Sequence, residues 1–112
     1  GAKKLESQDY QARLSSLERE YENIIGSLQI QLKKLLGQVS LADLQVEEKD
    51  IQYQKAFLEK EVYQKQLEKG LITKQEWKEK SLAYRNAEIN IKDARDKAFL
   101  SRLRVLHFVG MI

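Results

Sequence analysis

The stretch that decides the fold is EKGLITKQEW, residues 68–77, because it carries signals that end one helix and begin another. Gly70 can adopt the left-handed backbone conformation that closes a helix just after Lys69. Thr73 and Glu76 have the Thr-x-x-Glu spacing of a capping box, in which the threonine hydroxyl accepts a free backbone N–H at the start of a helix. The sequence therefore predicts a helix end, a short link and a new helix.

A pair of apolar side chains supports the same turn. Ile72 precedes the predicted cap and Trp77 follows it by four residues, which is the spacing of a hydrophobic staple. A link this short favours a second helix that returns antiparallel to the first.

Apolar residues recur at steps of three and four on both sides of the turn, as they do along one face of a helix. Gly37 and Gly70 are isolated glycines. The repeats predict an all-α antiparallel coiled-coil hairpin with a helix over 5–68, a tip over 69–73 and a helix over 74–106. Before the turn the repeat contains Tyr10, Leu14, Leu17, Tyr21, Ile24, Leu28, Leu32, Leu35 and Val39; after it come Trp77, Tyr84, Ile91, Ala98 and Val105.

A second set of turn signals leaves an alternative open. Gly37 could end a helix, Ser40 and Asp43 could cap the next one, and Val39 with Leu44 could form its staple. A turn at 37–40 would produce a three-helix up-down bundle. A glycine inside a helix costs only about 1 kcal/mol relative to alanine, so Gly37 alone does not force this break.

The composition offers little for catalysis. The chain has 112 residues, 33% of them charged, with no cysteine or proline and a single histidine, His107, in an apolar tail. It has no histidine pair or cysteine that could begin a metal site and no glycine-rich loop for phosphate. We therefore expect no catalytic residues, no cofactor, no metal and no enzyme activity, and no direct membrane contact, because no run of eighteen apolar residues is present.

The positive charge is concentrated after the turn. Residues 1–73 hold 11 basic and 12 acidic side chains, whereas residues 74–112 hold 9 basic and 5 acidic ones. An RNA-binding helical arm is therefore one alternative. Acidic Glu88, Asp93 and Asp96 interrupt the basic face, and a surface that follows phosphates normally has a cleaner excess of cations. We expect no nucleic acid partner.

The turn resembles the hairpin tip of bacterial periplasmic adaptor subunits, the membrane fusion proteins of the haemolysin-secretion type. The similarity covers YQKQLEKGLITKQEWKEKSLAY (residues 63–84), and LESQDYQARL (residues 5–14) is similar to the family's entry into its first hairpin helix. The positions that fit the family pattern are Gly70, Ile72, Thr73, Lys74, Glu76, Trp77, Ala83, Tyr84, Ala87, Ala94 and Ala98.

This resemblance implies a non-enzymatic arm in the periplasm, from a protein anchored in the inner membrane. The family links an inner-membrane transporter to an outer-membrane channel protein, its copies self-associate, and an Arg, a Leu and a Ser near the tip contact the channel. Thr73 stands at the Ser position, Leu67 lies one residue from the Leu position, and Val62 replaces the Arg. The resemblance thus implies a partner-binding tip formed by Leu67, Gly70, Leu71 and Thr73, on a turn held by Ile72, Glu76 and Trp77. A coiled-coil scaffold or spacer unrelated to transport is the other interpretation.

Overall fold

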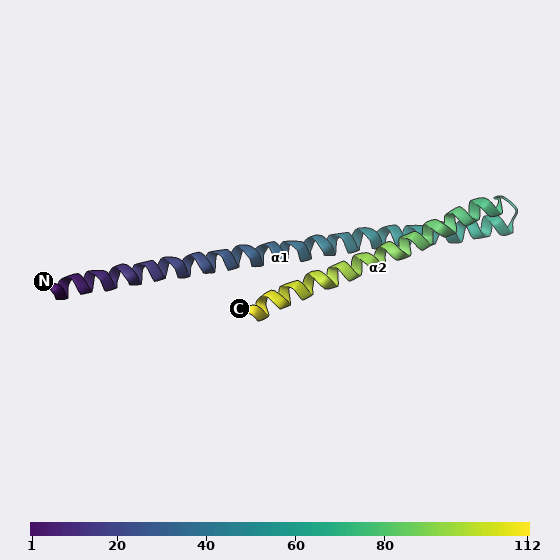
Figure 1. Cartoon of the computed structure of the whole chain (residues 1–112). Helices are drawn as coiled ribbons and strands as arrows, with labels where there is room; N and C mark the ends of the chain where they lie inside the picture. Colours follow the sequence, from purple (N-terminus) through teal and green to yellow (C-terminus); the bar gives the residue numbers. More distant parts are fainter. The chain divides into compact units, whose positions relative to one another are not determined.

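The computed structural model describes residues 1–112, and they form two helices. Helix α1 spans Ala2–Glu68 and helix α2 spans Lys74–Met111 (Figure 1). After a five-residue turn, α2 returns antiparallel along the C-terminal part of α1, so the predicted all-α helical hairpin is confirmed. The chain divides into two compact units, Gly1–Lys34 and Leu35–Ile112, and the second unit contains the hairpin.

The alternative turn at 37–40 is not formed, because α1 continues through it without interruption. A break there would interrupt the covered stripe of α1, on which Val39 and Val46 lie, and a helical glycine costs too little to force one. Asp43, the proposed capping residue, instead pairs with Arg102 of α2. Helix α2 also extends to Met111, five residues beyond the predicted end at 106.

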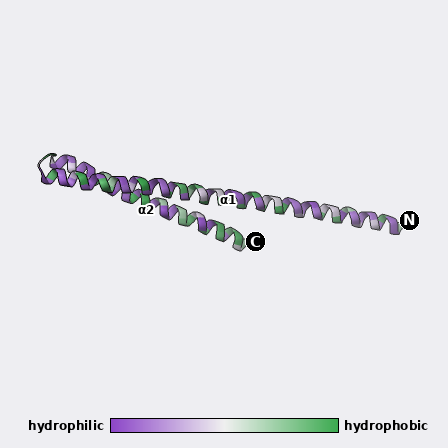
Figure 2. Cartoon of the chain, turned by 180° about the vertical axis from the view of Figure 1, so that it is seen from behind, coloured by the Kyte–Doolittle hydropathy of each residue, from purple (hydrophilic) through white to green (hydrophobic).

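The two helices of the hairpin meet along a seam whose positions alternate in steps of three and four. This is the spacing that keeps one face of each helix turned toward the other in a coiled coil. Hydrophobic residues recur along both helices (Figure 2). The covered positions on α1 are Leu35, Val39, Ala42, Val46, Lys49, Tyr53, Ala56, Lys60, Tyr63 and Leu67; those on α2 are Trp77, Lys80, Tyr84, Ala87, Ile91, Ala94, Ala98, Ser101, Val105 and Phe108.

The best-buried part of the seam lies midway along α2, where small residues let the helices approach closely. Ile91 is only 2% exposed, and Ala94, Ala98 and Ser101 are buried on the same face, as is Ala42 of α1. The Ser101 hydroxyl donates to the Ala98 carbonyl over 2.6 Å, so this buried polar group has a partner.

Two ion pairs beside the seam join the helices. Arg102 Nη2 lies 2.8 Å from Asp43 Oδ2, and Arg95 Nη2 lies 3.9 Å from Asp50 Oδ1. Hydrogen bonding to Asp43, together with its negative charge, raises the pKa of Arg102. Exposed pairs of this kind contribute about 0.2–1 kcal/mol each, so they support the register more than the stability of the hairpin.

The N-terminal unit is helical from Ala2 onward and presents most of its apolar stripe to solvent. Tyr10, Leu17 and Tyr21 of this stripe are 68%, 62% and 67% exposed. A stripe with coiled-coil spacing buries apolar surface only when another helix covers it.

Candidate partner-docking tip

The tip closes α1 with the hydrogen bonds of a Schellman motif. Gly70 has φ of 70°, the left-handed conformation that the sequence predicted. Its N–H donates to the Leu67 carbonyl over 3.0 Å, and the Leu71 N–H donates to the Gln66 carbonyl over 2.9 Å. These bonds satisfy two carbonyls at the end of α1 that have no partner within the helix.

The start of α2 is capped by Thr73. Its backbone is extended, with φ of −81° and ψ of 159°, and its Oγ1 accepts the Glu76 N–H over 3.1 Å. The Trp77 N–H donates to the Thr73 carbonyl over 3.1 Å. The Thr73 hydroxyl is engaged as the helix cap. Its first role is therefore to stabilise the turn, and a hydrogen bond to a partner would compete with the cap.

The staple residues lie partly inside the turn. Ile72 and Trp77 are half-buried, as is Leu67 at the last covered position of the α1 seam. Trp77 Nε1 is buried without a hydrogen-bond acceptor, which costs about 1–3 kcal/mol in typical proteins.

Leu71 is the large apolar side chain that the tip presents to solvent, with 70% of its surface exposed. In a Schellman motif the residue at this position commonly packs on the third-last helical residue. That residue is Gln66, which offers little apolar surface. Of the four predicted contact residues, Gly70 and Leu71 are accessible, Leu67 is half-covered by the seam, and Thr73 is exposed with its hydroxyl engaged.

Aromatic and cationic side chains of both helices contact one another across the seam between the tip and the best-buried part of the hairpin. Tyr53 Oη and Tyr84 Oη are 3.0 Å apart, and their ring centroids are 5.4 Å apart. Lys60 Nζ lies 4.5 Å from the centroid of the Tyr84 ring, and Lys80 Nζ lies 4.9 Å from that of Tyr63. These cation–π contacts explain how two of the three seam lysines, Lys60 and Lys80, occupy their positions, since each ammonium reaches a ring of the opposite helix.

The tyrosine pair also changes an ionisation equilibrium. The hydrogen bond with Tyr53 raises the pKa of Tyr84 from 10.0 to about 12, and partial desolvation and neighbouring negative charge act in the same direction. Either phenol oxygen can donate this hydrogen bond, and the raised pKa of Tyr84 means that the surroundings favour the protonated phenol. The contact thus favours neutral Tyr84.

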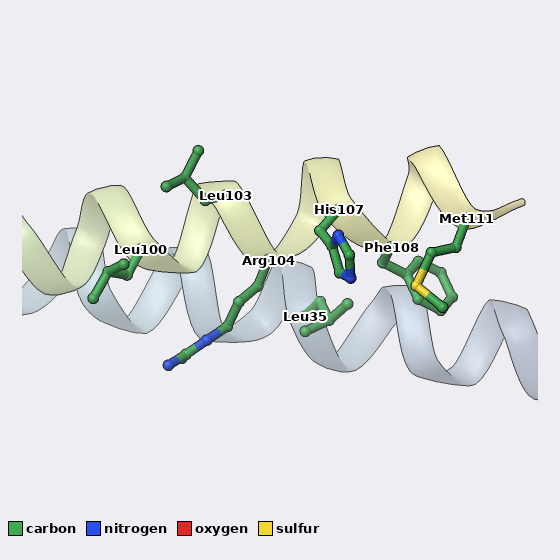
Figure 3. Close-up of a pocket in the computed structure, with 7 residues that line it drawn as sticks. All are labelled: Leu35, Leu100, Leu103, Arg104, His107, Phe108 and Met111. Atoms are coloured by element: carbon green, nitrogen blue, oxygen red, sulfur yellow. The ribbon is translucent and has the colours of Figure 1, made fainter.

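A second surface, which the sequence analysis missed, lies at the other end of the hairpin. It is an apolar groove of about 400 Å³ between the last turns of α2 and the facing part of α1 (Figure 3). Leu35 is its only lining residue from α1. The signal that could have revealed it is the run after Asp96, which contains no acidic residue and has apolar side chains on every face of the helix. The α2 residues that line it are Leu100, Leu103, Arg104, His107, Phe108 and Met111.

No three His, Cys, Asp or Glu side chains lie close enough together to hold a metal ion. Neither helix contains a stretch with the length and hydropathy needed to span a bilayer. No protein family, curated protein or solved structure matches the chain.

Proposed function

We propose that the chain is the non-enzymatic helical arm of a bacterial secretion or efflux adaptor, which links an inner-membrane transporter to an outer-membrane channel protein through its tip. The observation that carries the proposal is Leu71, exposed on a turn that is capped on both sides. The similarity of residues 63–84 to adaptor hairpin tips supports the same function. The arm would act in the periplasm as a spacer with one specific contact.

A rigid tip favours this kind of docking. Binding orders side chains and loops at an interface, and a turn already held in one conformation avoids much of that cost. Gly70 and Thr73 fix the two helix ends that the turn joins. Complete burial of one leucine contributes about 1.5–3 kcal/mol, which is weak alone but effective when several copies of the arm bind together.

The chemistry of the tip indicates an apolar contact with the channel. Val62 occupies the position at which the adaptor family has an arginine, and it is exposed on α1. The Thr73 hydroxyl is engaged within the turn. The proposed channel surface is therefore a shallow apolar pocket that accepts Leu71, without the acidic group that an arginine would require.

The test places a photo-cross-linking amino acid at Leu71 of the natural protein in the bacterium from which the gene comes. Leu82 is the matched control, because it is a leucine on α2, 57% exposed and outside the turn. The proposal predicts a product with an outer-membrane channel protein from position 71 and little or none from position 82. Equal products from both positions, or no channel product, would contradict it. Products only between copies of the arm would favour the scaffold interpretation.

A further inference from the structure

Two segments of the chain carry opposite charges and exposed apolar surfaces. Residues 5–28 contain five acidic side chains and two arginines, a net charge of −3. Residues 97–112 contain Lys97, Arg102 and Arg104 and no acid, a net charge of +3 with neutral His107. Opposite charges of this size favour an encounter between the segments.

The acidic segment is an unfilled coiled-coil seam. Its apolar residues follow alternating steps of four and three, and four of the six have more than half of their surface exposed, whereas Leu14 is 45% exposed and Leu28 is half-buried. Glu18 and Glu20 flank this stripe, and Glu22 lies one turn away. The stripe consists of Tyr10, Leu14, Leu17, Tyr21, Ile24 and Leu28.

The basic segment offers grooves that such a stripe could fill. The 400 Å³ groove contains Arg104 and His107 among apolar side chains (Figure 3). A second groove of about 280 Å³ is lined by Leu36, Val39, Arg102, Val105 and Leu106. Residues 35–42, the part of α1 that supplies side chains to both grooves, carry no charge, so Arg102 and Arg104 set the local potential. Arg102 is already paired with Asp43, which leaves Arg104 to meet a carboxylate.

We propose that two copies of this chain form a dimer in which the acidic stripe of each copy packs into the basic grooves of the other. Charge disfavours the two simpler pairings, because stripe against stripe and groove against groove each bring like net charges together. Since each copy has one stripe and one groove region, two reciprocal contacts satisfy both copies through a twofold axis. Neither contact uses Leu71, so this dimer and the proposed docking of the tip are separate claims.

A charge-exchange experiment on the full chain tests the dimer. Variant A carries Glu18→Lys, Glu20→Lys and Glu22→Lys; variant B carries Arg104→Glu and His107→Glu. Four of the five positions flank the stripe or line the groove, and Glu22 lies one turn from the stripe; the carboxylates and the guanidinium are exposed. Mass is measured by light scattering or sedimentation equilibrium at low and physiological salt, with helicity checked by circular dichroism.

The proposal predicts a dimer for the original chain, weakened by added salt. Variants A and B should each dimerise about tenfold or more weakly. An equimolar mixture of A and B should recover the dimer, because one contact keeps the original opposite charges and the other brings the new lysines of A to the two new glutamates of B. The control variant Glu61→Lys, Glu68→Lys, Glu79→Lys changes exposed acids near the tip and should dimerise like the original chain. A photo-cross-linker at Leu17 should react with residues 97–112 of a differently isotope-labelled copy.

Three outcomes would overturn the proposal. The original chain could remain monomeric at every concentration and bind phosphatidylserine vesicles through its basic segment instead. Its dimer could be insensitive to variants A and B, or fail to re-form in their mixture. The Leu17 cross-linker could react only with the acidic segment of the second copy, which would show stripe against stripe. The mass measurements and the Leu17 cross-link do not depend on the channel cross-link at Leu71. The proposed dimer and the proposed docking of the tip can therefore fail independently.

Discussion

Replacing Gly70 by alanine should destabilise the hairpin, whereas the same replacement at Gly37 should stabilise it. An added Cβ meets no atom within 4 Å at either position, so steric crowding by neighbours does not distinguish them. The difference lies in the backbone, because Gly70 has φ of 70° and Gly37 lies inside helix α1. Alanine in the left-handed region costs about 1–2 kcal/mol, and alanine replacing a helical glycine contributes about 1 kcal/mol of stability.

The two variants should therefore differ by about 2–3 kcal/mol in the free energy of unfolding, which corresponds to about two orders of magnitude in the unfolding constant. Urea unfolding followed through the fluorescence of Trp77 measures this difference. Trp77 is the only tryptophan and is half-buried next to the turn, so its signal reports on the hairpin. Gly70→Asn serves as an intermediate variant, since asparagine tolerates the left-handed region better than alanine does. Equal stability of Gly70→Ala and Gly37→Ala would refute the assignment of the turn to Gly70.

Three further substitutions test the cap, the core and the tyrosine pair. Thr73→Ala should lower the free energy of unfolding by about 1 kcal/mol, and Thr73→Ser should retain most of it, in the same urea assay. Ile91→Ala, at the best-buried large side chain, should cost about 2–5 kcal/mol, and a loss below about 1 kcal/mol would contradict the close packing seen there. Tyr53→Phe should lower the pKa of Tyr84 from about 12 toward 10.0, as followed by ultraviolet absorbance. The raised pKa of Tyr84 stabilises the folded protein below pH 10, and this stabilisation is lost as the pH rises through about 12. Tyr53→Phe should therefore make the free energy of unfolding depend less on pH between pH 10 and about 12.

The turn at the tip could be predicted from the sequence because its signals are local. Gly70, Thr73 and Glu76 each act on backbone groups within a few residues, and the structure contains the predicted left-handed glycine and threonine cap. The same local signals at Gly37 did not end the helix. Local patterns could not show whether the helix continues past Gly37. Its continuation keeps Val39 and Val46 on the half-buried stripe of α1, and that burial depends on a helix far along the chain.

The parts that could not be predicted depend on contacts between the helices. Lys60 and Lys80 interrupt an apolar repeat, and only the rings of Tyr84 and Tyr63 across the seam show how their charges are accommodated. The groove at the end of α2 was missed for a related reason. Its α2 residues recur at steps of three and four along one face of that helix, and the contribution of Leu35 depends on the antiparallel register.

The antiparallel register that the Gly70 turn sets is tested most directly by photo-oxidative cross-linking of tyrosines, followed by mass spectrometry of the digested monomer. Neighbouring phenol rings couple to dityrosine, and the rings of Tyr53 and Tyr84 have centroids 5.4 Å apart. The structure predicts an intramolecular product that joins these two residues and that is lost in Tyr84→Phe. A monomer without this product would contradict the register, and so would a monomer whose cross-links join Tyr84 only to other tyrosines.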